Sequence, residues 1–144
     1  MDQVKAQTFV SGTGTFIHPS ARICGPEGGE ARSVVLGDHC YIGEGVQIRC
    51  NDFSLGDFGK IHHQVNIHGG LPCHIGHNAW IGQFSIIDST GGAEIGDNCG
   101  IGAHSQLWSH IKYGDTLARI IHEWVASTRF RCSCAGFRGM TATA

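Results

Sequence analysis

The sequence predicts an all-β solenoid, a parallel β-helix built from hexapeptide coils. Twelve aliphatic residues carry this prediction, because they form four triplets with a spacing of six, and the triplets recur every nineteen or twenty residues. The triplets are Leu36, Ile42 and Ile48; Leu55, Ile61 and Ile67; Ile75, Ile81 and Ile87; Ile95, Ile101 and Leu107. An α-helix would space apolar residues by three and four and an alternating strand by two, so neither explains the pattern.

Glycines and other small residues occur at constant sequence offsets from the aliphatic residues. A glycine follows the first aliphatic of every triplet, at Gly37, Gly56, Gly76 and Gly96. Each hexapeptide is expected to form a short strand and a bend, and three hexapeptides make one triangular coil whose aliphatic residues stack at strand spacing, about 4.8 Å. Mostly small residues lie two positions earlier and should also point inward, namely Cys40, Gly59, Ala79, Cys99, Val46, Val65, Ser85, Ser105, Cys73 and Ala93, with Phe53 as the one large exception.

The chain divides into three parts along its length. Residues 1–14 form a polar N-terminal lead-in, residues 15–115 form the β-helix domain, and residues 116–144 form a C-terminal helix and tail. Ile17 and Ile23 begin the first coil, and the Pro- and Gly-containing stretch 24–33 reads as a loop. A short C-terminal α-helix over roughly 116–128 is predicted from helical spacing, at Leu117, Ile120, Ile121, Trp124 and Val125, and would cover the open end of the solenoid.

The length, charge and hydropathy of the chain argue against several classes of function. The 144 residues suffice for one domain, and the formal net charge of −2 with no basic stripe argues against a nucleic-acid partner. No apolar run approaches the ~20 residues that span a bilayer, and the N-terminus lacks the apolar segment of a signal peptide. The sequence therefore predicts a cytoplasmic protein without a membrane partner.

Three of the seven cysteines fall in the inward columns of small residues. Cys40, Cys73 and Cys99 are therefore predicted to be reduced, buried thiols, since their neighbours in these columns are not cysteines. Cys132 and Cys134 lie in the tail, which has no period, and are expected to react earlier than the core thiols.

The repeats resemble those of the hexapeptide-repeat acyltransferase superfamily. The resemblance covers roughly residues 15–115 and rests on LGDHCYIGEGVQI, IGHNAWIGQFSII and IGDNCGIGAHSQL, with FIHPSARI as the opening. It implies a left-handed coil, acetyl-CoA or another acyl-CoA as co-substrate, a small-molecule sugar or amine acceptor, and no metal.

The resemblance also implies a homotrimer with its site in a cleft between neighbouring subunits. Large apolar residues that are expected to point outward from the solenoid support this expectation, because a neighbouring subunit would shield them from water. They are Phe58, Trp80, Phe84, Ile86 and Trp108.

One column of polar residues directly follows the third aliphatic of each triplet. It reads Arg49, His68, Asp88 and Trp108, with side chains expected to point outward. Stacked strands would place His68 about 5 Å from both Arg49 and Asp88. A carboxylate can fix the tautomer of an imidazole, and a general base needs such a partner. In the resembling enzymes a histidine activates the acceptor, so His68 is the candidate base, with Asp88 orienting it.

Other residues complete the candidate site. His63, beside Gln83 of the next coil, is the rival base. Trp108 and Lys112 are the candidates for contact with the acyl-CoA co-substrate.

Two other readings stay open. The polar column could be a solvent-exposed ladder on a non-catalytic trimeric scaffold or binding protein. The γ-class carbonic anhydrases use the same fold and hold a metal with three histidines, of which His68 matches one. Gln83 and Asp88 occupy the other two places, and glutamine is a poor zinc ligand.

Overall fold

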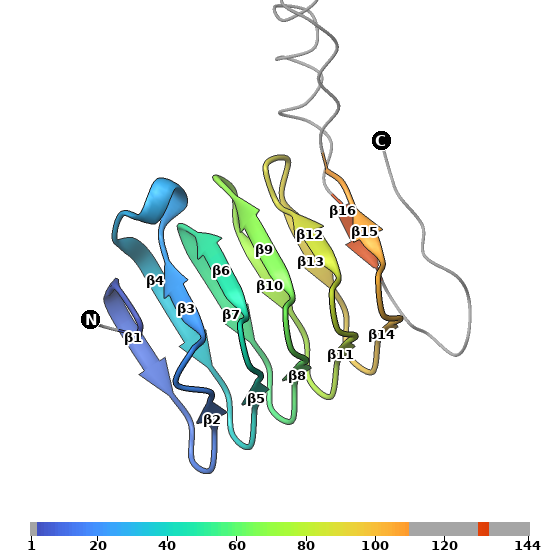
Figure 1. The fold of residues 1–144 in the computed structure, drawn as a ribbon, viewed down its shortest axis with the longest axis horizontal. Helices are drawn as coiled ribbons and strands as arrows, with labels where there is room; N and C mark the ends of the chain where they lie inside the picture. Colours follow the sequence, from blue (N-terminus) through green and yellow to red (C-terminus); the bar gives the residue numbers. More distant parts are fainter. Residues whose placement is uncertain (1–2, 110–129, 133–144) are drawn as a thin grey trace, which may run out of the picture.

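Three parallel β-sheets form the walls of a three-sided solenoid (Figure 1). The computed structural model describes residues 3–109 and the backbone of residues 130–132. Sheet 1 contains β1 (Ala6–Ser11), β4 (Ala31–Leu36), β7 (Asp52–Leu55), β10 (Cys73–Ile75), β13 (Ala93–Ile95) and β16 (Phe130–Cys132). Sheet 2 contains β2 (Phe16–Ile17), β5 (Tyr41–Ile42), β8 (Lys60–Ile61), β11 (Trp80–Ile81) and β14 (Gly100–Ile101). Sheet 3 contains β3 (Arg22–Cys24), β6 (Gln47–Cys50), β9 (Asn66–Gly69), β12 (Ile86–Asp88) and β15 (Gln106–Leu107).

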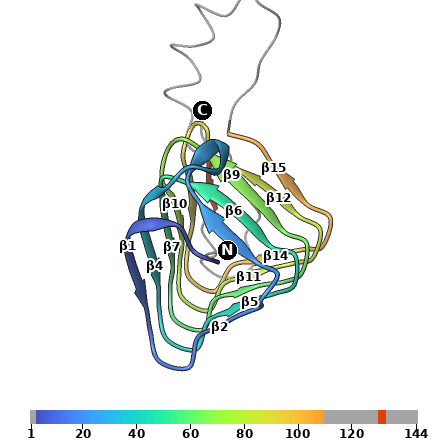
Figure 2. The same cartoon turned by 60° about the vertical axis from the view of Figure 1, so that its left-hand side comes forward.

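The coil is left-handed, as the family resemblance implies. Viewed from the N-terminal end in Figure 2, the chain descends along sheet 1, crosses the base along sheet 2 and rises along sheet 3 while it recedes. Left-handed backbone recurs at the corners, where non-glycine residues adopt positive φ values between 52° and 58°. These residues are His39, Phe58, Asn78 and Asn98 after sheet 1, and Gln64, Phe84 and His104 after sheet 2. In each of these turns one residue therefore has left-handed backbone dihedral angles. Asparagine and histidine adopt this conformation more readily than most other residues.

The twelve aliphatic residues fill the interior, which confirms the predicted repeat. None exceeds the 6% exposure of Leu107. Ile42, Ile61, Ile81 and Ile101 are Cα partners on consecutive strands of sheet 2, so one stack runs along the solenoid. Phe53 is also buried, despite its size.

Side chains at the corner after sheet 1 bind the backbone of the preceding coil. Asp38 Oδ1 accepts the Thr13 N–H at 2.8 Å, and Asp57 Oδ1 accepts the Asp38 N–H at the same distance. His77 Nδ1 accepts the Asp57 N–H at 2.9 Å, and Asp97 Oδ1 accepts the His77 N–H at 2.7 Å. Each turn is thus tied to the next by a side chain that follows a glycine.

Further elements lie at the two ends of the solenoid. The lead-in 1–14 contains β1, which pairs with β4 from Ala6↔Ala31 to Ser11↔Leu36. The loop 24–33 contains a short 3-10 turn, Pro26–Gly28. Near the C-terminus β16 pairs with β13, although the sequence there has no period. The predicted helix over 116–128 lies outside the described residues. Within the described part, no helix is both long and apolar enough to cross a membrane.

Cys40, Cys73 and Cys99 are buried thiols that form no disulfide, as predicted. Outside the predicted inward columns, a further fully buried cysteine, Cys50, is a hydrogen-bond partner of Cys73. Donation of this hydrogen bond, together with burial, raises the pKa of Cys73, whereas accepting it lowers the pKa of Cys50. Cys50 was not predicted because it is the last residue of β6, beyond the inward positions that the hexapeptide defines.

Candidate functional site

The predicted polar column lies on sheet 3 in the expected register. Arg49 on β6 is the Cα partner of His68 on β9, and His68 is the Cα partner of Asp88 on β12. Trp108 directly follows β15, and its ring meets the His68 imidazole edge to face at a centroid distance of 6.1 Å. Three coils therefore bring an imidazole, a carboxylate and an indole together.

Asp88 does not reach solvent, although the column to which it belongs is expected to face outward. Asp88 is completely buried, whereas the His68 side chain is 37% exposed. His68 Nε2 lies 3.4 Å from Asp88 Oδ1, within ion-pair distance when the imidazole is protonated. The imidazole is thus accessible to solvent while its acidic partner is not.

Hydroxyl and backbone donors replace water around the buried carboxylate. Thr90 Oγ1 donates to Asp88 Oδ1 at 2.7 Å. Ser109 donates twice to Asp88 Oδ2, from its hydroxyl at 2.8 Å and from its backbone N–H at 3.2 Å. A buried carboxylate requires such donors, because burying an uncompensated charge costs several kcal/mol.

A further column of small residues, which was not predicted, lies two positions after the third aliphatic of each triplet. This column reads Cys50, Gly69, Ser89 and Ser109, and its two serines are completely buried. Ser89 Oγ donates to the His68 carbonyl at 3.2 Å and lies 3.4 Å from Cys50 Sγ. A small residue in every coil at this place was the signal that could have revealed the column.

Of the other predicted site residues, His63 lies apart from the His68–Asp88 pair, Trp108 contacts His68, and Lys112 falls outside the described residues. His63 lies in the turn before β9, and its ring centroid is 5.3 Å from that of Phe84, whereas His68 lies within β9. Trp108 is half exposed and donates its indole N–H to Gln106 Oε1 at 3.3 Å. Lys112 is outside the described residues.

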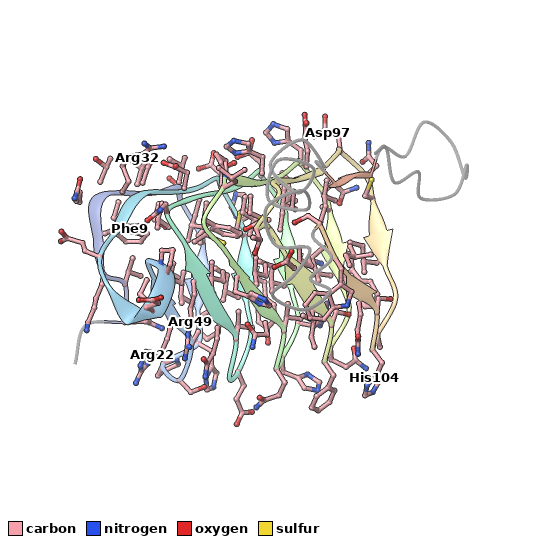
Figure 3. The ribbon with its side chains drawn as sticks, turned by 90° about the horizontal axis from the view of Figure 1, so that it is seen from above. Phe9, Arg22, Arg32, Arg49, Asp97 and His104 are labelled. Carbon is pink, nitrogen blue, oxygen red and sulfur yellow. The ribbon has the colours of Figure 1, made fainter. Side chains whose placement is uncertain are left out.

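Charge is unevenly distributed around the solenoid. Arg22 and Arg49 lie on one side, and Arg32 and Asp97 lie on the opposite side (Figure 3). Arg49 donates to Gln47 Oε1 at 2.9 Å and is exposed. Asp88 is the one carboxylate on the five strands of sheet 3, and it is buried. The accessible charges on this sheet are therefore cationic.

The described residues contain no group of three or more His, Cys, Asp or Glu side chains arranged to hold a metal ion. The two places that a γ-class metal site would need beside His68 hold Gln83 and Asp88. Asp88 already accepts hydrogen bonds from Thr90 and Ser109. The described part of the chain thus supplies no histidine triad.

A shallow groove of about 560 Å³ lies on another face, along sheet 1 and the turns that follow it. Ser54 Oγ and His74 Nδ1 are 2.7 Å apart in this groove. Its other polar groups include Asp57, His77 and Asp97, which already bind backbone N–H groups of neighbouring coils. We assign these groups to turn structure and place the candidate site at His68, where the carboxylate is shielded from water.

Comparison with known proteins gives a distant relative. The bifunctional protein GlmU of Anaplasma marginale, in the strains Florida and St. Maries, is 30% identical over 110 residues. The matched region is 73% of this chain and 23% of the relative, so the chain spans about a quarter of that protein's length. No protein-family model matches the chain, and no solved structure matches it.

The three parallel sheets, the left-handed coil and the hexapeptide register define a left-handed parallel β-helix. Together with the similarity to GlmU, these features fit the hexapeptide-repeat acyltransferase superfamily.

Proposed function

We propose that the protein transfers an acyl group from acetyl-CoA or another acyl-CoA to a hydroxyl or amine of a small acceptor such as a sugar. The contact between the half-exposed His68 imidazole and the buried Asp88 carboxylate carries this proposal. Because Nε2 faces Asp88, the carboxylate favours the tautomer with its proton on Nε2 and leaves Nδ1 free to accept a proton. A general base placed in this way contributes typically 10²–10⁴-fold to a rate.

In the proposed reaction His68 removes the proton of the acceptor O–H or N–H as that atom attacks the thioester carbonyl. The new C–O or C–N bond forms and the C–S bond breaks, and the CoA thiolate takes a proton from the imidazolium. Asp88 stabilises the imidazolium that forms between these two steps. The reaction needs no group beyond the acyl-CoA and the acceptor.

The surroundings of His68 suit an anionic co-substrate. Arg49 is its strand neighbour, and Arg22 lies on the same side of the solenoid (Figure 3). Cationic side chains attract the phosphates of CoA, and the exposed indole of Trp108 offers a surface for stacking. Lys112 remains the second candidate for contact with CoA, as the sequence predicts.

We also propose a homotrimer in the cytoplasm. Phe58, Trp80, Phe84 and Trp108 are all between 39% and 54% exposed, and exposed apolar patches of this kind mark interaction surfaces. Light scattering at micromolar protein concentration should give three times the mass of the 15.4 kDa chain. A monomer mass under these conditions would contradict the trimer.

A thermal-shift series tests the proposed co-substrate. Acetyl-CoA and CoA should each raise the melting temperature by several degrees, because a ligand at 100 times its Kd stabilises the native state by about 2.7 kcal/mol. ATP at the same concentration is the control for nonspecific binding of phosphates to Arg22 and Arg49. Stabilisation by zinc alone would instead favour the γ-class lyase, and no shift with any ligand would favour the scaffold.

A further inference from the structure

The N-terminal edge of sheet 1 has no partner strand among the described residues. β1 is the first strand of this sheet and pairs on one side only, with β4 (Figure 1). A free strand edge is a template for pairing with another chain, and proteins usually protect it with charges, proline or a covering segment. We propose that β1 is a docking edge whose occupant is β1 of a second copy of this chain, paired antiparallel across a twofold axis.

The other two sheets are covered at the same end of the solenoid. Val4 forms a parallel bridge with Ile23, so the chain before β1 lies along the edge of β3. The Gln3 side-chain amide donates to the His18 carbonyl, directly after β2. β1 itself reads Ala-Gln-Thr-Phe-Val-Ser, without charge or proline, and its last five residues are exposed. Within the described part of the chain, β1 therefore lacks the protection that the neighbouring edges have.

The backbone of β1 determines the register of this pairing. The Gly12 N–H donates to the Leu36 carbonyl of β4 at 2.9 Å. Because backbone groups alternate in direction along a strand, those of Val10 also face β4, whereas those of Phe9 and Ser11 face the free edge. An antiparallel pair with the two Phe9 residues directly opposite lets them exchange two N–H···O=C hydrogen bonds.

The side chains agree with this register. Phe9 is the Cα partner of the buried Val34, so its side chain faces the interior, but it is 44% exposed at the end of the solenoid opposite to His104 (Figure 3). Opposite residues of an antiparallel pair lie on the same face of the sheet. The two Phe9 rings would therefore pack on each other and extend the core of one copy into the next.

The two ends of the pair are complementary in charge and in shape. With Phe9 opposite Phe9, Lys5 of one copy lies opposite Thr13 of the other. The Thr13 N–H binds Asp38 Oδ1 at 2.8 Å, and both Lys5 and Asp38 are exposed, so an ammonium meets a carboxylate at each end of the pair. The same axis sets the edge of sheet 3, raised by the bridging segment 3–5, against the edge of sheet 2, which has no further described strand beyond β2.

Sedimentation equilibrium of the full chain, from micromolar to millimolar concentration, tests the pairing. The contact joins two strand edges and is small, so it should be weaker than the lateral assembly. The mass should therefore rise with concentration to twice its micromolar value. This doubling does not depend on the proposed trimer, because a micromolar mass of one chain would contradict the trimer alone.

Two substitutions at Phe9 should abolish the doubling. Phe9→Lys places two ammonium groups opposite each other across the axis, and like charges in that position are destabilising. Phe9→Pro removes an N–H that faces the free edge, where a strand tolerates proline, and is the second variant if the first does not fold. Val10→Thr is the matched control, because Val10 is 52% exposed on the same strand but its backbone groups face β4. Its mass should still double.

Hydrogen exchange of the Phe9 amide gives a second readout, and in the wild type its protection should increase with protein concentration. A constant mass over the concentration range would overturn the inference. Growth beyond twice the micromolar mass would also overturn it, because the copies would then stack head to tail. Protection of the Phe9 amide at every concentration would mean that another segment of the same chain covers the edge, which likewise contradicts the proposed occupant.

Discussion

Replacing His68 by alanine should lower the rate of acyl transfer from acetyl-CoA by about 10²–10⁴-fold, the usual contribution of a general base. His68 combines an accessible imidazole with a carboxylate that solvent cannot reach, 3.4 Å from its Nε2. Release of the CoA thiol in the presence of a panel of amino sugars and amines measures the effect. The loss should appear in kcat, because the base acts on the acceptor proton in the transition state.

The His68→Ala variant should remain folded. His68 is partly exposed, and Thr90 and Ser109 still donate to the Asp88 carboxylate when the imidazole is removed. His63→Ala is the control, since His63 is an exposed histidine next to the same strand that contacts Phe84 rather than Asp88. Full activity in His68→Ala with loss in His63→Ala would transfer the role of base to His63.

The core and register were predictable because the hexapeptide signal is local and repeated. A spacing of six placed Ile42, Ile61 and Ile81 in one stack, and the structure has them as consecutive Cα partners. The same register implied that His68 neighbours Asp88, since both residues follow the third aliphatic of their coils. Repetition thus determined which strands pair and which residues lie side by side.

The burial of Asp88 could not be predicted from the same rule. Alternation along a strand turns the side chain after Ile87 outward, but β12 ends at Asp88 and the chain turns there. Burial then depends on donors that lie 2 and 21 residues away, Thr90 and Ser109. β16 escaped prediction for a related reason, because a single strand of three residues has no repeat of its own to reveal it.

Replacing Gly76 by alanine should destabilise the protein by about 1–3 kcal/mol, the usual cost of overpacking an interior. A Cβ atom at Gly76 would lie 2.7 Å from the Asp97 nitrogen and 2.8 Å from the Gly96 carbonyl carbon, in addition to meeting Asp97 Oδ1. Backbone of the next coil cannot move aside as a flexible side chain can. Displacement of Asp97 would also weaken its hydrogen bond with the His77 N–H, which joins the two turns.

Gly100→Ala is the matched control, and urea denaturation of both variants measures the difference. A Cβ atom at Gly100 meets no atom within 4 Å, because Gly100 is exposed and lies in the outward column of sheet 2 that holds Lys60 and Trp80 on the preceding strands. This variant should be as stable as the wild type or more stable by about 0.4–1 kcal/mol, since alanine restricts the unfolded chain. Neither glycine has a positive φ, so backbone conformation does not separate the two sites. Equal stability of the two variants would therefore mean that the coils can move apart at the corner after sheet 1, and that the glycine column does not reflect close approach of successive coils.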